Sequence, residues 1–194
     1  MNMQTRILVR YGAAMLLAMT LGMTAFAKPK VTILATGGTI AGAQSSQSEY
    51  GYKAGAWKVE DLINAVPQMK DLADISGEQV VNIGSQDMND EVWLKLARRV
   101  NEVLARSDVD GIVITHGTDT IEETGYFLNL VVKSRKPVVL TAAMRPSTAL
   151  SADGPLNFFN AVAVAASRKA AGLGVLVVVN DGIHGASSLT KTST

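Results

Sequence analysis

The sequence contains no cysteine, few aromatic residues and almost no net charge. Phe, Trp and Tyr make up 5% of its 194 residues, and 18 Lys and Arg nearly balance 17 Asp and Glu. Without cysteine, a disulfide framework, a thiolate zinc site and a cysteine nucleophile are excluded. The balanced charge gives no electrostatic basis for binding nucleic acid. Hydrophobic residues (47%) and glycine (17 residues) are abundant, which predicts a globular chain with an aliphatic core and tight loops.

The first 27 residues differ in character from the rest of the chain. Arg6 and Arg10 precede 17 uncharged residues (11–27), which contain an apolar run and end in the small-x-small tripeptide Ala-Phe-Ala at 25–27. This pattern is typical of a secretory signal peptide. A membrane anchor is the alternative, but an anchor needs about 20 apolar residues and this run is shorter. We therefore expect removal of residues 1–27, leaving one domain at 28–194 that is periplasmic or secreted and not held at the membrane.

From residue 28 onward, apolar β-branched runs alternate with amphipathic stretches. The runs are nearly continuous rather than alternating, which favours strands buried on both faces. Five strands separated by helices predict an α/β fold, a doubly wound parallel sheet. The expected strands are 31–34, 79–83, 111–115, 138–141 and 175–179, and the expected helices are about 58–66, 90–104, 120–131 and 155–165.

In such a sheet, ligands bind beyond the carboxyl ends of the strands, so the loops that follow the strands are informative. After the first expected strand, Gly37 and Gly38 precede Thr39, and a long polar loop containing Tyr52 comes next. The glycines lack the lysine of a P-loop and the spacing of a dinucleotide fingerprint. A nucleotide-dependent oxidoreductase stays a minor alternative. The better interpretation is a reactive Thr39 close to the backbone, with the Tyr52 loop as a lid.

The loop after the third strand carries Thr118 and Asp119, and Lys191 follows the fifth strand. A threonine nucleophile needs a base or a network that carries its proton, which a hydroxyl, a carboxylate and an ammonium could form if these two strands were neighbours. Thr118 or Asp119 could equally be a helix cap. The two histidines, His116 and His184, have no metal-binding motif beside them and are interpreted as hydrogen-bonding loop residues.

Six short strings in this order resemble bacterial type II L-asparaginases, and together they extend over most of residues 29–194. They are 35–42 (ATGGTIAG), 84–89 (GSQDMN), 115–120 (THGTDT), 143–148 (AMRPST), 151–155 (SADGP) and 190–192 (TKT).

The resemblance implies an amidohydrolase that converts L-asparagine to L-aspartate and ammonia, with L-glutamine as a lesser substrate, in the periplasm. It implies the large N-terminal domain of the asparaginase fold and a β-aspartyl ester on a threonine. No metal or organic cofactor is implied. The resemblance implies that Thr39 is the nucleophile and that Tyr52 belongs to the lid. It implies that Ser85 and Gln86 bind the substrate. Thr118, Asp119 and Lys191 are implied to form the proton network, and Asp119 is implied to bind the substrate as well.

This chain departs from the family pattern because it stops three residues after Lys191. We expect the C-terminal domain to be absent, and the homotetramer implied for full-length relatives is not carried over to this chain. We accordingly expect weak or no asparaginase activity. The main alternative is an inactive fragment with only a binding or interaction role.

Overall fold

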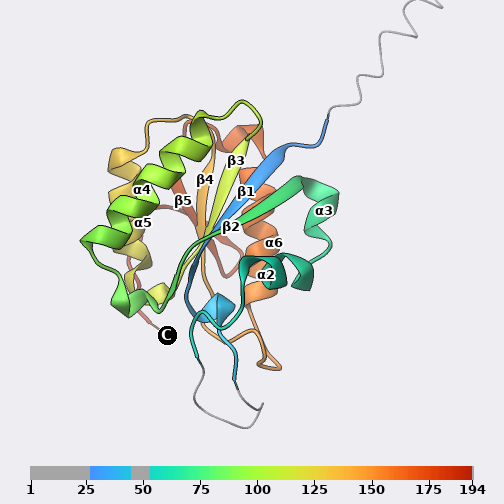
Figure 1. Cartoon of the computed structure of the whole chain (residues 1–194), viewed down its shortest axis with the longest axis vertical. Coiled ribbons are helices and arrows are strands. Elements are labelled where there is room, and N and C mark those ends of the chain that lie inside the picture. The colour runs from blue at the N-terminus through green and yellow to red at the C-terminus, as the bar shows by residue number, and fades with distance from the viewer. Residues whose placement is uncertain (1–26, 45–52, 194) are drawn as a thin grey trace, which may run out of the picture.

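A computed structural model describes residues 27–44 and 53–193, which form one six-stranded sheet with helices on both faces (Figure 1). The strand order is β2-β1-β3-β4-β5-β6. Five strands are parallel, and β6 runs antiparallel to β5 at the edge. The strands are β1 (Lys30–Gly37), β2 (Asp74–Ile83), β3 (Gly111–Thr115), β4 (Val138–Thr141), β5 (Val175–Val179) and β6 (Gly182–Gly185).

Two apolar layers cover the sheet, one on each face. On one face, α2 (Val59–Ala65), α3 (Met69–Leu72) and α6 (Gly154–Ala165) pack on the sheet around Phe158, Met69 and Ile33. On the other face, α4 (Asp90–Ala105) and α5 (Ile121–Val131) pack around Leu96 and Leu128. Figure 1 shows these two helix groups on opposite sides of the sheet. The predicted doubly wound α/β architecture is confirmed. Helices cover both faces because the continuous apolar strands need cover on each side.

Local signals fix where two of the helices begin. The Asn89 side chain accepts a hydrogen bond from the backbone of Val92 (3.1 Å), so Asn89 caps α4 as its position in the sequence predicted. Pro155 lies in the first turn of α6, where a missing backbone N–H costs nothing.

The structure differs from the sequence prediction at both edges of the sheet. The strand β2 is longer than expected and is not buried on both faces; Val80 alone among its residues is buried, because β2 is an edge strand. The short strand β6 was not predicted, since its sequence GIHG has little β-propensity. It forms because Asn180 (φ 49°) and Asp181 (φ 57°) make a tight turn that folds the chain back onto β5.

The expected signal peptide lies outside the described residues, except for the exposed Ala27. Within residues 27–44 and 53–193, no helix combines the length and hydropathy needed to cross a bilayer.

Two glycine loops meet closely where β1 and β3 end. Gly38 has φ +78°, and a Cβ at that position would lie 2.4 Å from the backbone nitrogen of Gly117. A side chain there would meet rigid backbone rather than a flexible group. Because β1 and β3 are neighbouring parallel strands, their carboxyl ends bring these two peptides together.

We expect Gly38→Ala to lower the free energy of unfolding by about 1–3 kcal/mol, since it adds backbone strain and displaces the Gly117 peptide. Gly185→Ala is the matched control, because the nearest atom to its added Cβ is 3.8 Å away. The control should change stability by less than about 0.5 kcal/mol. Urea denaturation followed by circular dichroism measures both, and equal effects would show that the close approach is not tight.

Candidate active site

Lys191 joins the two candidate residues of the β3 loop at the carboxyl edge of the sheet. Its Nζ donates to Thr118 Oγ1 and to Asp119 Oδ1, each at 2.8 Å. The Lys191 side chain is 21% exposed and the Asp119 side chain 58%. The ammonium is thus largely enclosed, while the carboxylate stays open to a ligand. The predicted hydroxyl, carboxylate and ammonium cluster is present.

The route by which Lys191 reaches this cluster differs from the predicted one. The strands β3 and β5 are not neighbours, because β4 lies between them. Instead the chain turns through β6 and returns beside α5, where the Ala186 methyl lies 3.1 Å from the Cβ position of Gly125. The backbone N–H of Lys191 then donates to the carboxylate of Glu122. Glu122 is therefore a residue of the site that the sequence interpretation missed, since its contact depends on this return path.

Ser85 fixes the loop that carries the cluster. Its Oγ accepts a hydrogen bond from the backbone N–H of Asp119 (3.1 Å), and its carbonyl accepts one from the Thr120 hydroxyl (2.8 Å). Ser85 is 5% exposed, in the short 3-10 helix after β2. The alternative interpretation of Thr118 or Asp119 as a cap is wrong, because Gly117 and Thr120 occupy the N-cap positions of the two helices that begin here.

The other predicted site residues have different placements. Thr39 is 8% exposed and begins a 3-10 helix directly after Gly38, whose Cβ position lies 2.4 Å from the Gly117 nitrogen. Gln86 is exposed, and its amide donates to the Asp87 carboxylate (3.3 Å). Tyr52 lies outside the described residues.

Neither histidine belongs to a cluster of metal ligands in residues 27–44 and 53–193, where no three His, Asp or Glu side chains gather. His116 is fully buried, and its Nδ1 lies 2.7 Å from the Gly117 carbonyl. Burial lowers its pKa to about 4, so the ring is neutral at pH 7. The interpretation of His116 as a hydrogen-bonding loop residue is confirmed.

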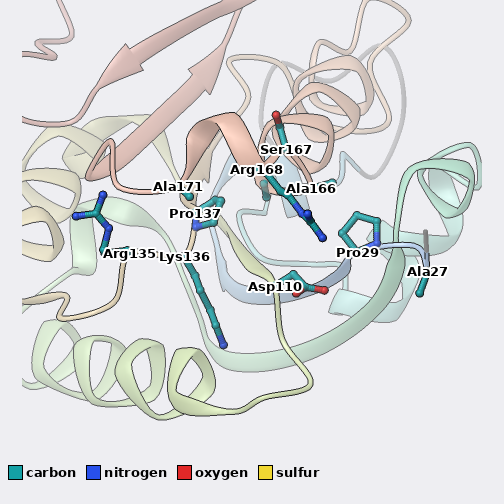
Figure 2. Close-up of a pocket in the computed structure, with 11 residues that line it drawn as sticks. Ala27, Pro29, Asp110, Arg135, Lys136, Pro137, Ala166, Ser167, Arg168 and Ala171 are labelled. Atoms are coloured by element: carbon teal, nitrogen blue, oxygen red, sulfur yellow. The ribbon is translucent and has the colours of Figure 1, made fainter. Parts of the chain in front are cut away.

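Two of the cavities in the described part of the chain lie at opposite ends of the strands. One of about 420 Å³ adjoins the cluster and is lined by Thr118 and Lys191, with Arg145 and Asp153 from the loop after β4. The other, about 560 Å³, lies at the amino ends of the strands (Figure 2). The larger cavity lacks comparable chemistry, because Lys136 donates to two backbone carbonyls and Asp110 accepts the Lys30 N–H. We therefore place the candidate site at the carboxyl edge.

Comparison with known proteins identifies the family of this chain. Residues 30–194 match the family model described as asparaginase, N-terminal. The chain belongs to the asparaginase family. It is 62% identical over 167 residues to L-asparaginase 2 of Bacillus subtilis, covering 86% of this chain and 44% of that protein. It is 61% identical over 166 residues to a probable periplasmic L-asparaginase of Haemophilus influenzae, covering 86% of this chain and 47% of that protein.

A solved structure supports the same assignment of the fold. The crystal structure of a probable cytoplasmic L-asparaginase from Campylobacter jejuni superposes with a TM-score of 0.83 at 56% identity, covering 86% of this chain and 51% of that one. The chain thus spans about half the length of the relatives it matches. The family gives no support to a nucleotide-dependent oxidoreductase.

We expect Glu122→Ala to release the Lys191 backbone, so its amide should exchange with solvent faster than in the wild type. Glu122→Gln keeps an acceptor oxygen and should preserve most of the protection. Glu123→Ala is the control, since that neighbouring glutamate is exposed. Hydrogen exchange read by NMR distinguishes the variants; if Glu122→Ala and Glu123→Ala exchanged alike, Glu122 would not hold the lysine segment.

Proposed function

We propose that this protein hydrolyses the side-chain amide of L-asparagine to give L-aspartate and ammonia. The observation that carries the proposal is the Lys191 ammonium bound to both Thr118 and Asp119, in the loop that touches the Gly38–Thr39 turn. This arrangement combines a proton-carrying network with an open carboxylate next to a candidate nucleophile. Membership of the asparaginase family points to the same reaction.

Substrate recognition follows from the charges at the site. The more than half-exposed Asp119 carboxylate can accept the α-ammonium of an amino acid in a charge-assisted hydrogen bond. Ser85 accepts the Asp119 N–H, so its own hydroxyl proton is available for an α-carboxylate oxygen. The exposed amide of Gln86 can donate to the same carboxylate if it turns from Asp87. These groups would hold the amino acid end while the side-chain amide reaches Thr39.

The chemical step would run through two covalent changes. Thr39 Oγ forms a bond to the amide carbon, its proton passes to the amide nitrogen, and the carbon–nitrogen bond breaks to release ammonia. Water then cleaves the β-aspartyl ester and restores the Thr39 hydroxyl. Thr118, Lys191 and Asp119 form the hydrogen-bonded network through which protons can be exchanged. Backbone N–H groups near Thr118 would stabilise the oxyanion, a contribution of about 3–4 kcal/mol for each donor.

L-glutamine is expected to be a slower substrate of the same site. It carries the same ammonium, carboxylate and amide groups, separated by one additional methylene. One methylene is typically worth only about 1–3 kcal/mol in discrimination, so the site can disfavour glutamine but cannot exclude it.

We expect Thr39→Ala to abolish ammonia release from L-asparagine, because it removes the attacking oxygen. Thr39→Ser keeps the hydroxyl and should retain measurable turnover. An enzyme-coupled ammonia assay on the purified chain, with circular dichroism to confirm folding, measures the three proteins. Turnover by Thr39→Ala equal to that of the wild type would remove Thr39 as the nucleophile. A folded wild type that binds L-asparagine without releasing ammonia would instead indicate a protein with only a binding role.

We further propose that the protein is exported and cleaved after Ala27. The pattern of residues 1–27 supports export, and the Haemophilus influenzae relative is named periplasmic. Intact-mass spectrometry of protein recovered from the periplasm of a bacterial host should give a chain that begins at Lys28. Recovery of the uncleaved chain from the cytoplasm would contradict this proposal.

A further inference from the structure

A series of hydrogen bonds, part-buried at Trp93 and buried from Thr124 onward, connects α4 to the candidate catalytic loop. Trp93 on α4 donates from Nε1 to Thr124 Oγ1 on α5 (2.8 Å). Thr124 Oγ1 lies 3.1 Å from His116 Nε2, and His116 Nδ1 lies 2.7 Å from the Gly117 carbonyl. His116 and Thr124 are both fully buried.

The donor and acceptor capacities of these groups fix the direction of each hydrogen bond in the series. A carbonyl oxygen can only accept, so His116 Nδ1 must carry a proton. The ring is neutral at pH 7, so Nε2 carries none and accepts the Thr124 hydroxyl proton. Indole nitrogen can only donate, so Thr124 accepts from Trp93. The hydrogen bonds from Trp93 through Thr124 and His116 to Gly117, here called the relay, therefore select a single tautomer of His116, with the proton on Nδ1.

The last bond in the relay acts on the peptide that joins Gly117 to Thr118. In a planar trans peptide the carbonyl and the next N–H point in opposite directions, so fixing the Gly117 carbonyl also fixes the Thr118 N–H. Gly117 itself packs closely against Gly38 and Ser85. The Cβ position of Gly38 lies 2.4 Å from the Gly117 nitrogen, and the Cβ position of Gly117 lies 2.4 Å from Ser85 Oγ.

We propose that Trp93, Thr124 and His116 are positioning residues that set the orientation of the Gly117–Thr118 peptide in the site. They touch neither the substrate nor the reacting atoms. Their effect on turnover rests on the proposed amidohydrolase function, whereas their effect on the peptide does not. Because Gly117, at the start of this peptide, lies against Gly38 and Ser85, a rotation of the peptide plane would disturb the approach of Thr39 as well.

The first experiment measures the His116 tautomer and the chemical shift of the Thr118 amide, and it does not need turnover. In ¹⁵N-labelled full chain, His116 should show a protonated Nδ1 and an unprotonated Nε2 at pH 7, with exposed His184 as the internal reference. Thr124→Val should shift the Thr118 amide and disturb this tautomer pattern, and Thr124→Ser should restore both. Thr32→Val is the control, since it removes a buried hydroxyl bonded to Ser76 elsewhere in the sheet.

The second experiment measures ammonia release from L-asparagine. We expect Thr124→Val to lower kcat about tenfold with KM within about twofold, since small displacements of reacting groups cost rate more than binding. Thr124→Ser should recover most of the loss. The proposal is overturned if wild-type His116 carries its proton on Nε2, or if Thr124→Val leaves the Thr118 amide where Thr32→Val leaves it. A wild type without ammonia release, but with the expected tautomer and amide shifts, would count against the proposed function alone.

Discussion

The close approach of two glycine peptides, at Gly38 and Gly117, is the constraint on which the rest of the candidate site depends. It follows from β1 and β3 being adjacent parallel strands, whose carboxyl ends meet at one edge. A side chain at either glycine would separate the Thr39 turn from the loop that carries Thr118 and Asp119. Ser85, from the loop after β2, closes the third side by accepting the Asp119 N–H. Three loops are thereby held together by a backbone approach and by the short Ser85 side chain, rather than by long flexible side chains.

Polar side chains outside these three contacts also support the carboxyl ends of the strands. The Glu122 carboxylate at the start of α5 accepts a hydrogen bond from the Lys191 backbone N–H, and His116 Nδ1 donates to the Gly117 carbonyl. The neutral state of His116 matters here, because a protonated ring would bring an unbalanced charge into the core. The Lys191–Asp119 pair, in contrast, lies partly in solvent and contributes little to stability. In the proposed reaction its role is to exchange protons, in the loop that touches the Gly38–Thr39 turn.

Much of this structure could be predicted from the sequence, and the exceptions have physical causes. Continuous apolar runs predicted β1, β3, β4 and β5 correctly, because burial on both faces leaves a strong signal, whereas β2 is an edge strand with Val80 alone buried. The edge strand β6 could not be predicted, since it is formed by a turn at Asn180 and Asp181 and not by β-propensity. The residues of the Thr118, Asp119 and Lys191 cluster were predicted, but the reason was wrong: β4 separates the two strands, and the return of the chain beside α5 makes the contact. Glu122 was missed because a single glutamate in a helical first turn normally reads as a favourable charge for the helix dipole.

The most direct test of the account is an NMR titration of the ¹⁵N-labelled chain with L-aspartate, the proposed product. If amino acids bind at the carboxyl edge, amide shifts should concentrate at Thr39, Ser85, Thr118 and Asp119. Asp119→Asn should weaken them, because it removes the charge that pairs with the ammonium. Shifts concentrated instead around Asp110 and Arg168, at the opposite cavity (Figure 2), would contradict the account.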